Sequence, residues 1–101
     1  MLTQILRDTA VIERKLEVSH ALGQDVAWQN VGTYWCRLVP VDTEGRIAYQ
    51  QYAGRYIGRF IFRGRPELSL NHRIIHGGRV YIPIDPPQDI ECGSMIVVRQ
   101  E

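Results

Sequence analysis

The sequence predicts an all-β protein, a small single-domain β-barrel or sandwich of about six antiparallel strands with one long loop between strands two and three. Three observations carry this prediction. A Gly77-Gly78 pair separates two short runs of β-branched and aromatic residues, which is typical of a two-residue hairpin. Residues 55–63 alternate between two faces, as a half-buried strand does. Finally, strand-like runs recur roughly every ten residues.

Length and composition indicate one globular domain. The chain has 101 residues, which predicts a single domain over 1–101 with a short N-terminal segment at 1–9. Hydrophobic residues make up 45% and charged residues 23%, which is usual for such a domain. Arg7 and Asp8 end the first apolar run early, so we expect neither a secretory signal nor a membrane span. We therefore expect a soluble protein made inside a cell.

The first half of the chain predicts two strands. Alternation of apolar and charged residues places the first strand at 10–20, with Arg14 interrupting its apolar face. Residues 22–25 (Leu-Gly-Gln-Asp) predict a turn-rich link. The second strand is predicted at about 32–39, and it ends at Pro40 because proline cannot donate a ladder hydrogen bond.

Residues 41–54 predict a long loop. Hairpin loops usually hold two to five residues, so a connection of this length in a small β domain is typically disordered or functional. The segment has no firm helix start or stop signal. This loop is therefore the first candidate for a functional segment of the protein.

The second half predicts the remaining strands. The third covers 55–63, and its core face is the one that carries Phe60 and Phe62. The hairpin follows at 73–75 and 79–84, and a last apolar strand is predicted at about 90–99.

The reactive residue types do not form a catalytic or metal-binding motif. Cys36 and Cys92 lie in apolar runs, which predicts reduced thiols acting as small core residues. His72 and His76 would share one face of a strand about 13 Å apart, whereas zinc ligands bind one centre at about 2 Å, and His20 has no partner motif. No sequence motif pairs a nucleophile with a base. We expect no enzyme activity, no metal and no cofactor.

The charge is uneven along the chain. The formal net charge is +1, but eleven of the twelve basic residues are arginine and only Lys15 is lysine. Arginines dominate residues 55–79, where Glu67 is the single acid, while acids dominate 85–101. Arginine favours bidentate pairs with carboxylates or with phosphates. Two interpretations remain open: one copy packs against another, or the arginines contact nucleic acid.

Three segments in order carry a family resemblance. They are Trp28 followed by 31–40 (VGTYWCRLVP), 60–65 (FIFRGR) leading to 71–82 (NHRIIHGGRVYI), and the final apolar strand that ends in Glu101. Together they cover residues 28–101, and they resemble the head–tail joining proteins of tailed phages, also called head-closure, stopper or head–tail adaptor proteins.

This resemblance implies a structural protein of a phage or gene transfer agent particle. The expected protein forms a ring of roughly six or twelve copies between the portal or adaptor and the tail terminator or tail tube. It completes the head and gates the DNA channel. The expected location is the virion neck, with packaged DNA as a further partner, no membrane, and assembly in the host cytoplasm. Two alternatives are a small nucleic-acid-binding β-barrel and another tail-completion or terminator ring component.

The resemblance also implies site residues. The loop at 42–53 would project into the channel, and its candidate residues are Asp42, Thr43, Glu44, Gly45, Arg46, Tyr49, Gln50, Gln51 and Tyr52. A ring interface is heterologous, so one face of a subunit must complement a different face of its neighbour. The candidate interface residues are Arg55, Arg59, Arg63 and Arg73 on one side and Asp85, Asp89 and Glu91 on the other.

Overall fold

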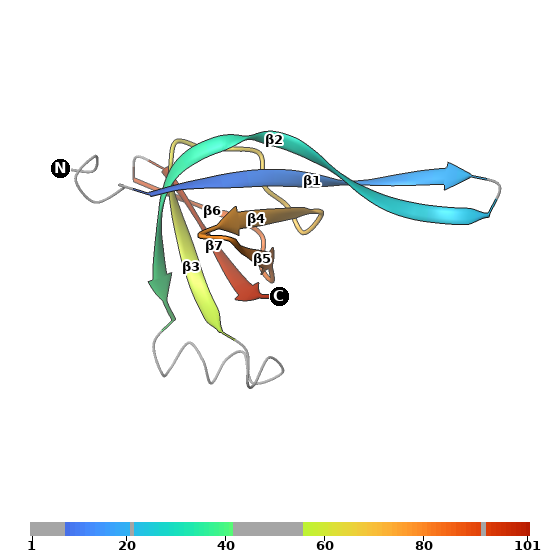
Figure 1. Cartoon of the computed structure of the whole chain (residues 1–101). Coiled ribbons are helices and arrows are strands. Elements are labelled where there is room, and N and C mark those ends of the chain that lie inside the picture. The colour runs from blue at the N-terminus through green and yellow to red at the C-terminus, as the bar shows by residue number, and fades with distance from the viewer. Residues whose placement is uncertain (1–7, 21, 42–55, 92) are drawn as a thin grey trace.

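The computed structural model describes residues 8–20, 22–41, 56–91 and 93–101, and every regular element in these ranges is a β-strand. Figure 1 shows the strands surrounding one interior, with the β1–β2 hairpin extending far beyond them. In chain order they are β1 (Asp8–His20), β2 (Gly23–Pro40), β3 (Ile57–Arg63), β4 (His72–His76), β5 (Arg79–Pro83), β6 (Gln88–Ile90) and β7 (Gly93–Gln100).

The strands form one antiparallel sheet that closes on itself. Their order is β3-β2-β1-β4-β5-β7-β6, and β3 pairs with β7 as well as with β2. The pairing of β3 with β7 joins the two sides of the sheet into a barrel, while the short β6 lies along β7 beside β5. This architecture confirms the predicted all-β barrel with antiparallel strands.

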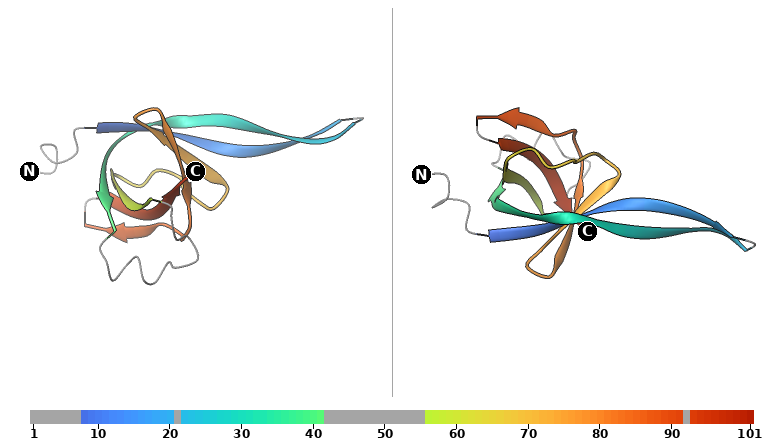
Figure 2. Two further views of the ribbon diagram at one scale, coloured as in Figure 1. Left: turned by 60° about the horizontal axis from the view of Figure 1, so that its bottom comes forward. Right: turned by 90° about the horizontal axis from the view of Figure 1, so that it is seen from above.

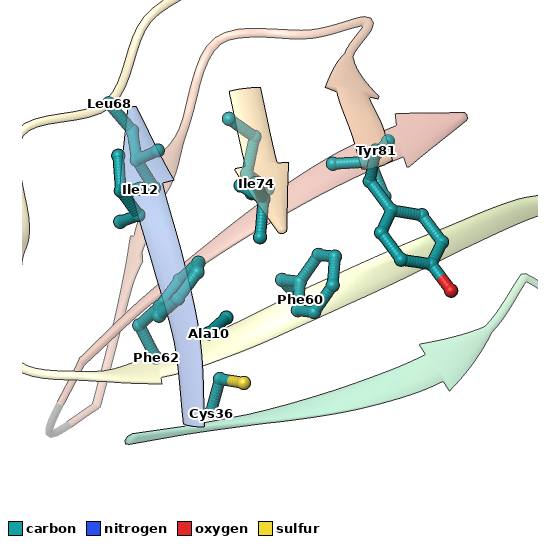
Figure 3. Packing of buried hydrophobic residues seen from close by; sticks show 10 residues of the cluster. Ala10, Ile12, Cys36, Phe60, Phe62, Leu68, Ile74 and Tyr81 are labelled. Carbon is teal, nitrogen blue, oxygen red and sulfur yellow. The ribbon is translucent and has the colours of Figure 1, made fainter. Parts of the chain in front are cut away.

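The barrel interior is filled by residues that alternate inward from all the principal strands (Figure 3). Phe60 and Phe62 stack with ring centroids 5.8 Å apart, and Phe60 also meets Tyr81 edge-on at 5.2 Å. The predicted core face of β3 is thus confirmed. The buried core cluster consists of Ala10, Ile12, Cys36, Phe60, Phe62, Leu68, Ile74, Tyr81, Ile96 and Val98.

The Gly-Gly hairpin is also confirmed. Gly77 and Gly78 form the turn between β4 and β5 with φ of 58° and 76°, a backbone region that glycine reaches without a Cβ clash. The pairs His76↔Arg79 and Ile75↔Val80 continue directly from this turn.

The prediction for the start of the second strand is wrong. β2 begins at Gly23 rather than near residue 32, so most of the predicted link at 22–25 is strand. Residues 23–30 pair continuously with β1 from His20↔Gly23 to Glu13↔Asn30, and the ladder continues past a bulge between Glu13 and Ile12. Pairing with β1 satisfies the backbone hydrogen bonds of residues 23–30 without placing their side chains in the barrel core. These residues therefore need no regular apolar alternation, which is the sequence signal for a strand.

The predicted last strand at 90–99 corresponds to β7, which begins three residues later, and Ile90 is the last residue of β6. β6 ends at Ile90 and β7 begins at Gly93, with Ile90↔Gly93 and Asp89↔Ser94 as partners in a tight hairpin. The apolar run at 96–98 is β7 itself, and its Ile96 and Val98 face the core.

The far part of the β1–β2 hairpin lies outside the barrel (Figures 1 and 2). We call residues 16–27 the arm. Pairing of β1 with β4 ends at Arg14, and a last hydrogen bond joins the Lys15 amide to the Asn71 carbonyl at 2.8 Å. Five further residues of β1 rise by about 3.3 Å each, so the arm extends roughly 17 Å past this point. The molecule measures 51 × 30 × 24 Å as a result.

Candidate functional site

The ends of the long connection are held side by side by the barrel. The Val41 amide donates to the Ile57 carbonyl at 3.2 Å, which continues the β2–β3 pairing past Pro40. Val41, Ile57 and Val97 form a second buried cluster, with Ile84 packed against it. The Gln100 amide donates to the Tyr56 carbonyl at 2.9 Å. The segment between these anchors therefore leaves and re-enters the fold at one place.

The candidate channel residues belong to this segment. Positions 42–55 lie outside the described residues, and so does the candidate interface residue Arg55. The channel candidates concerned are Asp42, Thr43, Glu44, Gly45, Arg46, Tyr49, Gln50, Gln51 and Tyr52.

Three arginines gather on the outer face of β2 and β3. Arg37 pairs across the strands with Ile61, and Arg59 and Arg63 are the diagonal neighbours on either side of Ile61. Residues at diagonal positions of adjacent strands have Cα atoms about 7–8 Å apart, which is within reach of long side chains. We call Trp35, Arg37, Arg59, Ile61 and Arg63 the arginine surface.

The arginine surface is accessible to a binding partner. Arg37 and Arg63 are exposed, Arg59 is half-buried, and Trp35 is 51% exposed. Within the described ranges, none of the three guanidinium groups forms an ion pair. Like charges on neighbouring strands repel one another, so an anionic partner would stabilise this face. Arg59 and Arg63 are among the interface residues that the sequence predicts, whereas Arg37 is not, although the alternation of β2 points it outward.

Arg73 lies elsewhere and already has partners within its own chain. Its Nε bonds Oε1 of Glu13 at 2.6 Å, and its guanidinium lies 4.2 Å from the ring centroid of Trp28. Both charged side chains are mostly buried, with 23% and 19% exposed. The pair follows from the β1–β4 register, which sets Glu13 opposite Arg73. These contacts fasten the base of the arm to the barrel.

The acidic candidates lie on and beside β6. Asp89 bonds Arg65 at 3.1 Å, but both side chains are largely exposed, so this pair contributes little to stability. Asp85 precedes β6 in the sequence, and Glu91 follows it. β7 lies between β6 and β3 in the sheet. The acidic residues on and beside β6 therefore lie on the opposite side of β7 from the arginine surface.

The buried titratable groups are structural. Burial raises the pKa of the Cys36 thiol to about 12, with the Asp8 carboxylate adding to the shift, so this thiol stays protonated and unreactive. Burial also lowers the pKa of His72; Glu67 opposes this shift and Arg14 adds to it. The Ser69 amide donates to Nδ1 of His72 at 3.1 Å, which fits the neutral imidazole. Cys92 lies outside the described residues.

Within the described ranges, no three His, Cys, Asp or Glu side chains gather closely enough to hold a metal ion. No helix of those ranges is long and apolar enough to cross a membrane.

The chain matches one family, and two of the solved structures that it resembles share its fold over most of its length. Residues 1–99 match the model of a family described as phage head completion protein. Among curated proteins, none matches this chain.

The two structures share the fold at low sequence identity. The solution structure of protein SF1141 from Shigella flexneri 2a has 21% identity and a TM-score of 0.78, covering 99% of this chain and 96% of its own. A chain from the virion of a native gene transfer agent particle has 17% identity and a TM-score of 0.57, covering 92% and 91%. At these identities the likeness concerns the fold.

Proposed function

Because this chain belongs to the phage head completion protein family, we propose that it forms a ring at the neck of the particle, between portal or adaptor and tail, and there closes the DNA channel. The family makes it a structural component of the phage head. The ring, its position at the head–tail joint and the closure of the channel are the proposal. Its neighbours would be the portal or adaptor on one side, the tail terminator or tail tube on the other, and packaged DNA inside.

The anchoring of residues 42–55 carries this proposal. A closed barrel whose two adjacent strands hold both ends of a long segment can present that segment to a ring axis while its own core stays intact. The segment contains Tyr49, Gln50, Gln51 and Tyr52, side chains able to pack or hydrogen-bond with their counterparts in neighbouring copies. Closure would be a rearrangement of this segment when the tail attaches or DNA is ejected.

The charged surfaces support a head-to-tail ring contact. Such an interface joins two different faces of the same protein. The proposed cationic residues are Arg59 and Arg63, together with Arg55, while Arg73 is already paired with Glu13. Asp85, Asp89 and Glu91 would supply anionic groups on the far side of β7.

Deleting residues 43–52 tests the closure of the channel. The Val41–Ile57 hydrogen bond would then close a connection of about five residues, a length that β-hairpins commonly use, so the barrel should still fold. Particles assembled with this variant should contain the protein at the normal level but lose packaged DNA. DNA content per particle, with immunoblotting for the protein, measures both.

A matched control and a folding check make the result decisive. Substituting alanine for Gln88, an exposed residue of β6 far from the anchors in sequence, should leave DNA content unchanged. If the deletion variant enters particles and these retain their DNA, the segment does not close the channel. If circular dichroism shows an unfolded deletion variant, the segment is part of the fold and the proposed role is equally contradicted.

A further inference from the structure

The arm carries apolar and acidic side chains that the barrel does not cover. Val26 is 53% exposed and Leu22 is 94% exposed, while Leu16 is 38% exposed. Glu17 lies directly opposite Val26 in the β1–β2 ladder, so both point to the same face of the ribbon. Within the described residues Glu17 has no ion-pair partner. A two-stranded ribbon with exposed apolar residues is marginal in water, and covering it would stabilise it.

The arginine surface has the complementary composition. It presents three cations around an apolar centre formed by Ile61, with the half-exposed ring of Trp35 beside it. Tryptophan and arginine are the residue types most enriched at the energetic centres of protein interfaces. An apolar strand bearing a carboxylate therefore fits this face in both charge and hydrophobicity.

The two surfaces cannot meet within one chain. Val26 and Trp35 belong to the same strand, β2, whose rise of about 3.3 Å per residue separates them by roughly 30 Å. The Arg73–Glu13 bond and the Arg73–Trp28 stacking hold the base of the arm in its direction. Figures 1 and 2 show the arm pointing away from the barrel and from β3 in all three views.

We propose that the arm of one copy binds the arginine surface of the next copy. Glu17 faces Arg37 and Arg63 of the neighbour, and Val26 packs on Ile61 and Trp35. The contact joins two different surfaces, so each copy offers an arm to one neighbour and receives the arm of another. This inference rests on the ring proposed above, and for Arg37 and Arg63 it assigns the neighbour's arm as the anionic partner in place of the acidic residues at 85–91.

Cysteine cross-linking in assembled particles tests this contact. Val26→Cys and Ile61→Cys are placed together in a Cys92→Ser background, and the particles are treated with a short bismaleimide. The buried Cys36 thiol, with its raised pKa, should not react. We expect a ladder of dimers, trimers and higher multimers on a denaturing gel, because a head-to-tail contact repeats around the ring.

The control pair keeps the arm cysteine and moves its partner. Val26→Cys combined with Arg79→Cys, at the exposed β4–β5 turn, should give no ladder. Dimers alone from the test pair would contradict the head-to-tail contact, since two copies that exchange arms form a closed pair. Cross-links from either cysteine only to a different virion protein would show that the arm or the arginine surface has another partner. The absence of any cross-link would also contradict the proposed contact.

Charge exchange gives a second measurement. Glu17→Arg should reduce the ladder several-fold by placing a cation against the arginine surface, and adding Arg63→Glu should restore it. Failure of the double variant to recover cross-linking, with both single variants folded, would contradict the pairing of Glu17 with this surface.

The outcomes also separate this inference from the proposed function. If the protein is missing from purified particles, its role in the virion is wrong, and the inference falls with it. If the protein is present and cryo-electron microscopy shows neighbouring copies in contact, but the Val26–Ile61 pair does not cross-link, the ring stands and only the assigned contact is wrong.

Discussion

Replacing Gly93 with alanine should disrupt the closure of the barrel. A Cβ at this position would lie 2.0 Å from the carbonyl oxygen of Phe62, and the clash is with backbone, which cannot rotate away. Gly93 is opposite Arg63 at one end of the β3–β7 ladder, the pairing that joins the two sides of the sheet. Relief of the clash requires the two strands to separate locally.

The expected loss is about 3 kcal/mol in the free energy of unfolding, the upper end of the range for overpacking. Urea denaturation of the purified protein measures it. Gly32→Ala is the matched control, because its Cβ would meet only the ring of Tyr34, at 3.1 Å, and a side chain can shift. If Gly93→Ala is as stable as Gly32→Ala, the close approach of β7 to β3 is wrong.

Phe60→Ala should have an effect of similar or greater size. Phe60 is fully buried at the centre of the barrel, and its ring meets Phe62, Tyr81 and His76 at centroid distances of 5.2 to 5.8 Å. Removing it creates a cavity lined by three other rings. Phenylalanine-to-alanine changes in cores cost about 3–5 kcal/mol, a large share of the stability of a small domain.

The same denaturation experiment checks this prediction. Leu70→Ala is the control, since Leu70 is 59% exposed and its truncation should change stability by about 0.5 kcal/mol or less. A Phe60→Ala protein that unfolds at the same urea concentration as the Leu70→Ala protein would contradict the position of Phe60 in the core.

The sequence predicts the barrel well where the signal is local. The alternation along residues 56–63 identifies the core face because the period of two follows from strand geometry alone. The Gly77-Gly78 turn is equally local. The closure of β3 on β7 pairs residues that are thirty or more positions apart, and no pattern within either segment encodes that register.

The β2 half of the arm was missed for a different physical reason. Residues 23–30 begin as a turn does, since Gly23 and Asp25 are common in turns, and the residues that follow do not alternate between apolar and polar. They form a strand because they pair with β1, and that pairing needs backbone hydrogen bonds rather than buried side chains. Residues 23–30 therefore lack the regular hydrophobic alternation by which a strand is found in a sequence.

The candidate site could be predicted in part. Alternation assigns Arg59 and Arg63 to the outer face, and the structure adds Arg37 beside them through the β2–β3 register. Arg73 belonged to the same cationic stretch of sequence, yet it pairs with Glu13, sixty positions away. A charge count along the chain cannot separate a paired arginine from an unpaired one, because the partner is set by tertiary structure.

We propose that this protein forms a ring that closes the DNA channel at the neck of the particle. Cryo-electron microscopy of particles that carry it, with the protein located by a small tag at its C-terminus, tests that claim most directly. We expect a ring of barrels between portal and tail, with residues 42–55 turned toward the axis and DNA density ending at that level. Tagged protein on the capsid shell or along the tail, or barrels at the neck with those residues turned away from the axis, would contradict the claim.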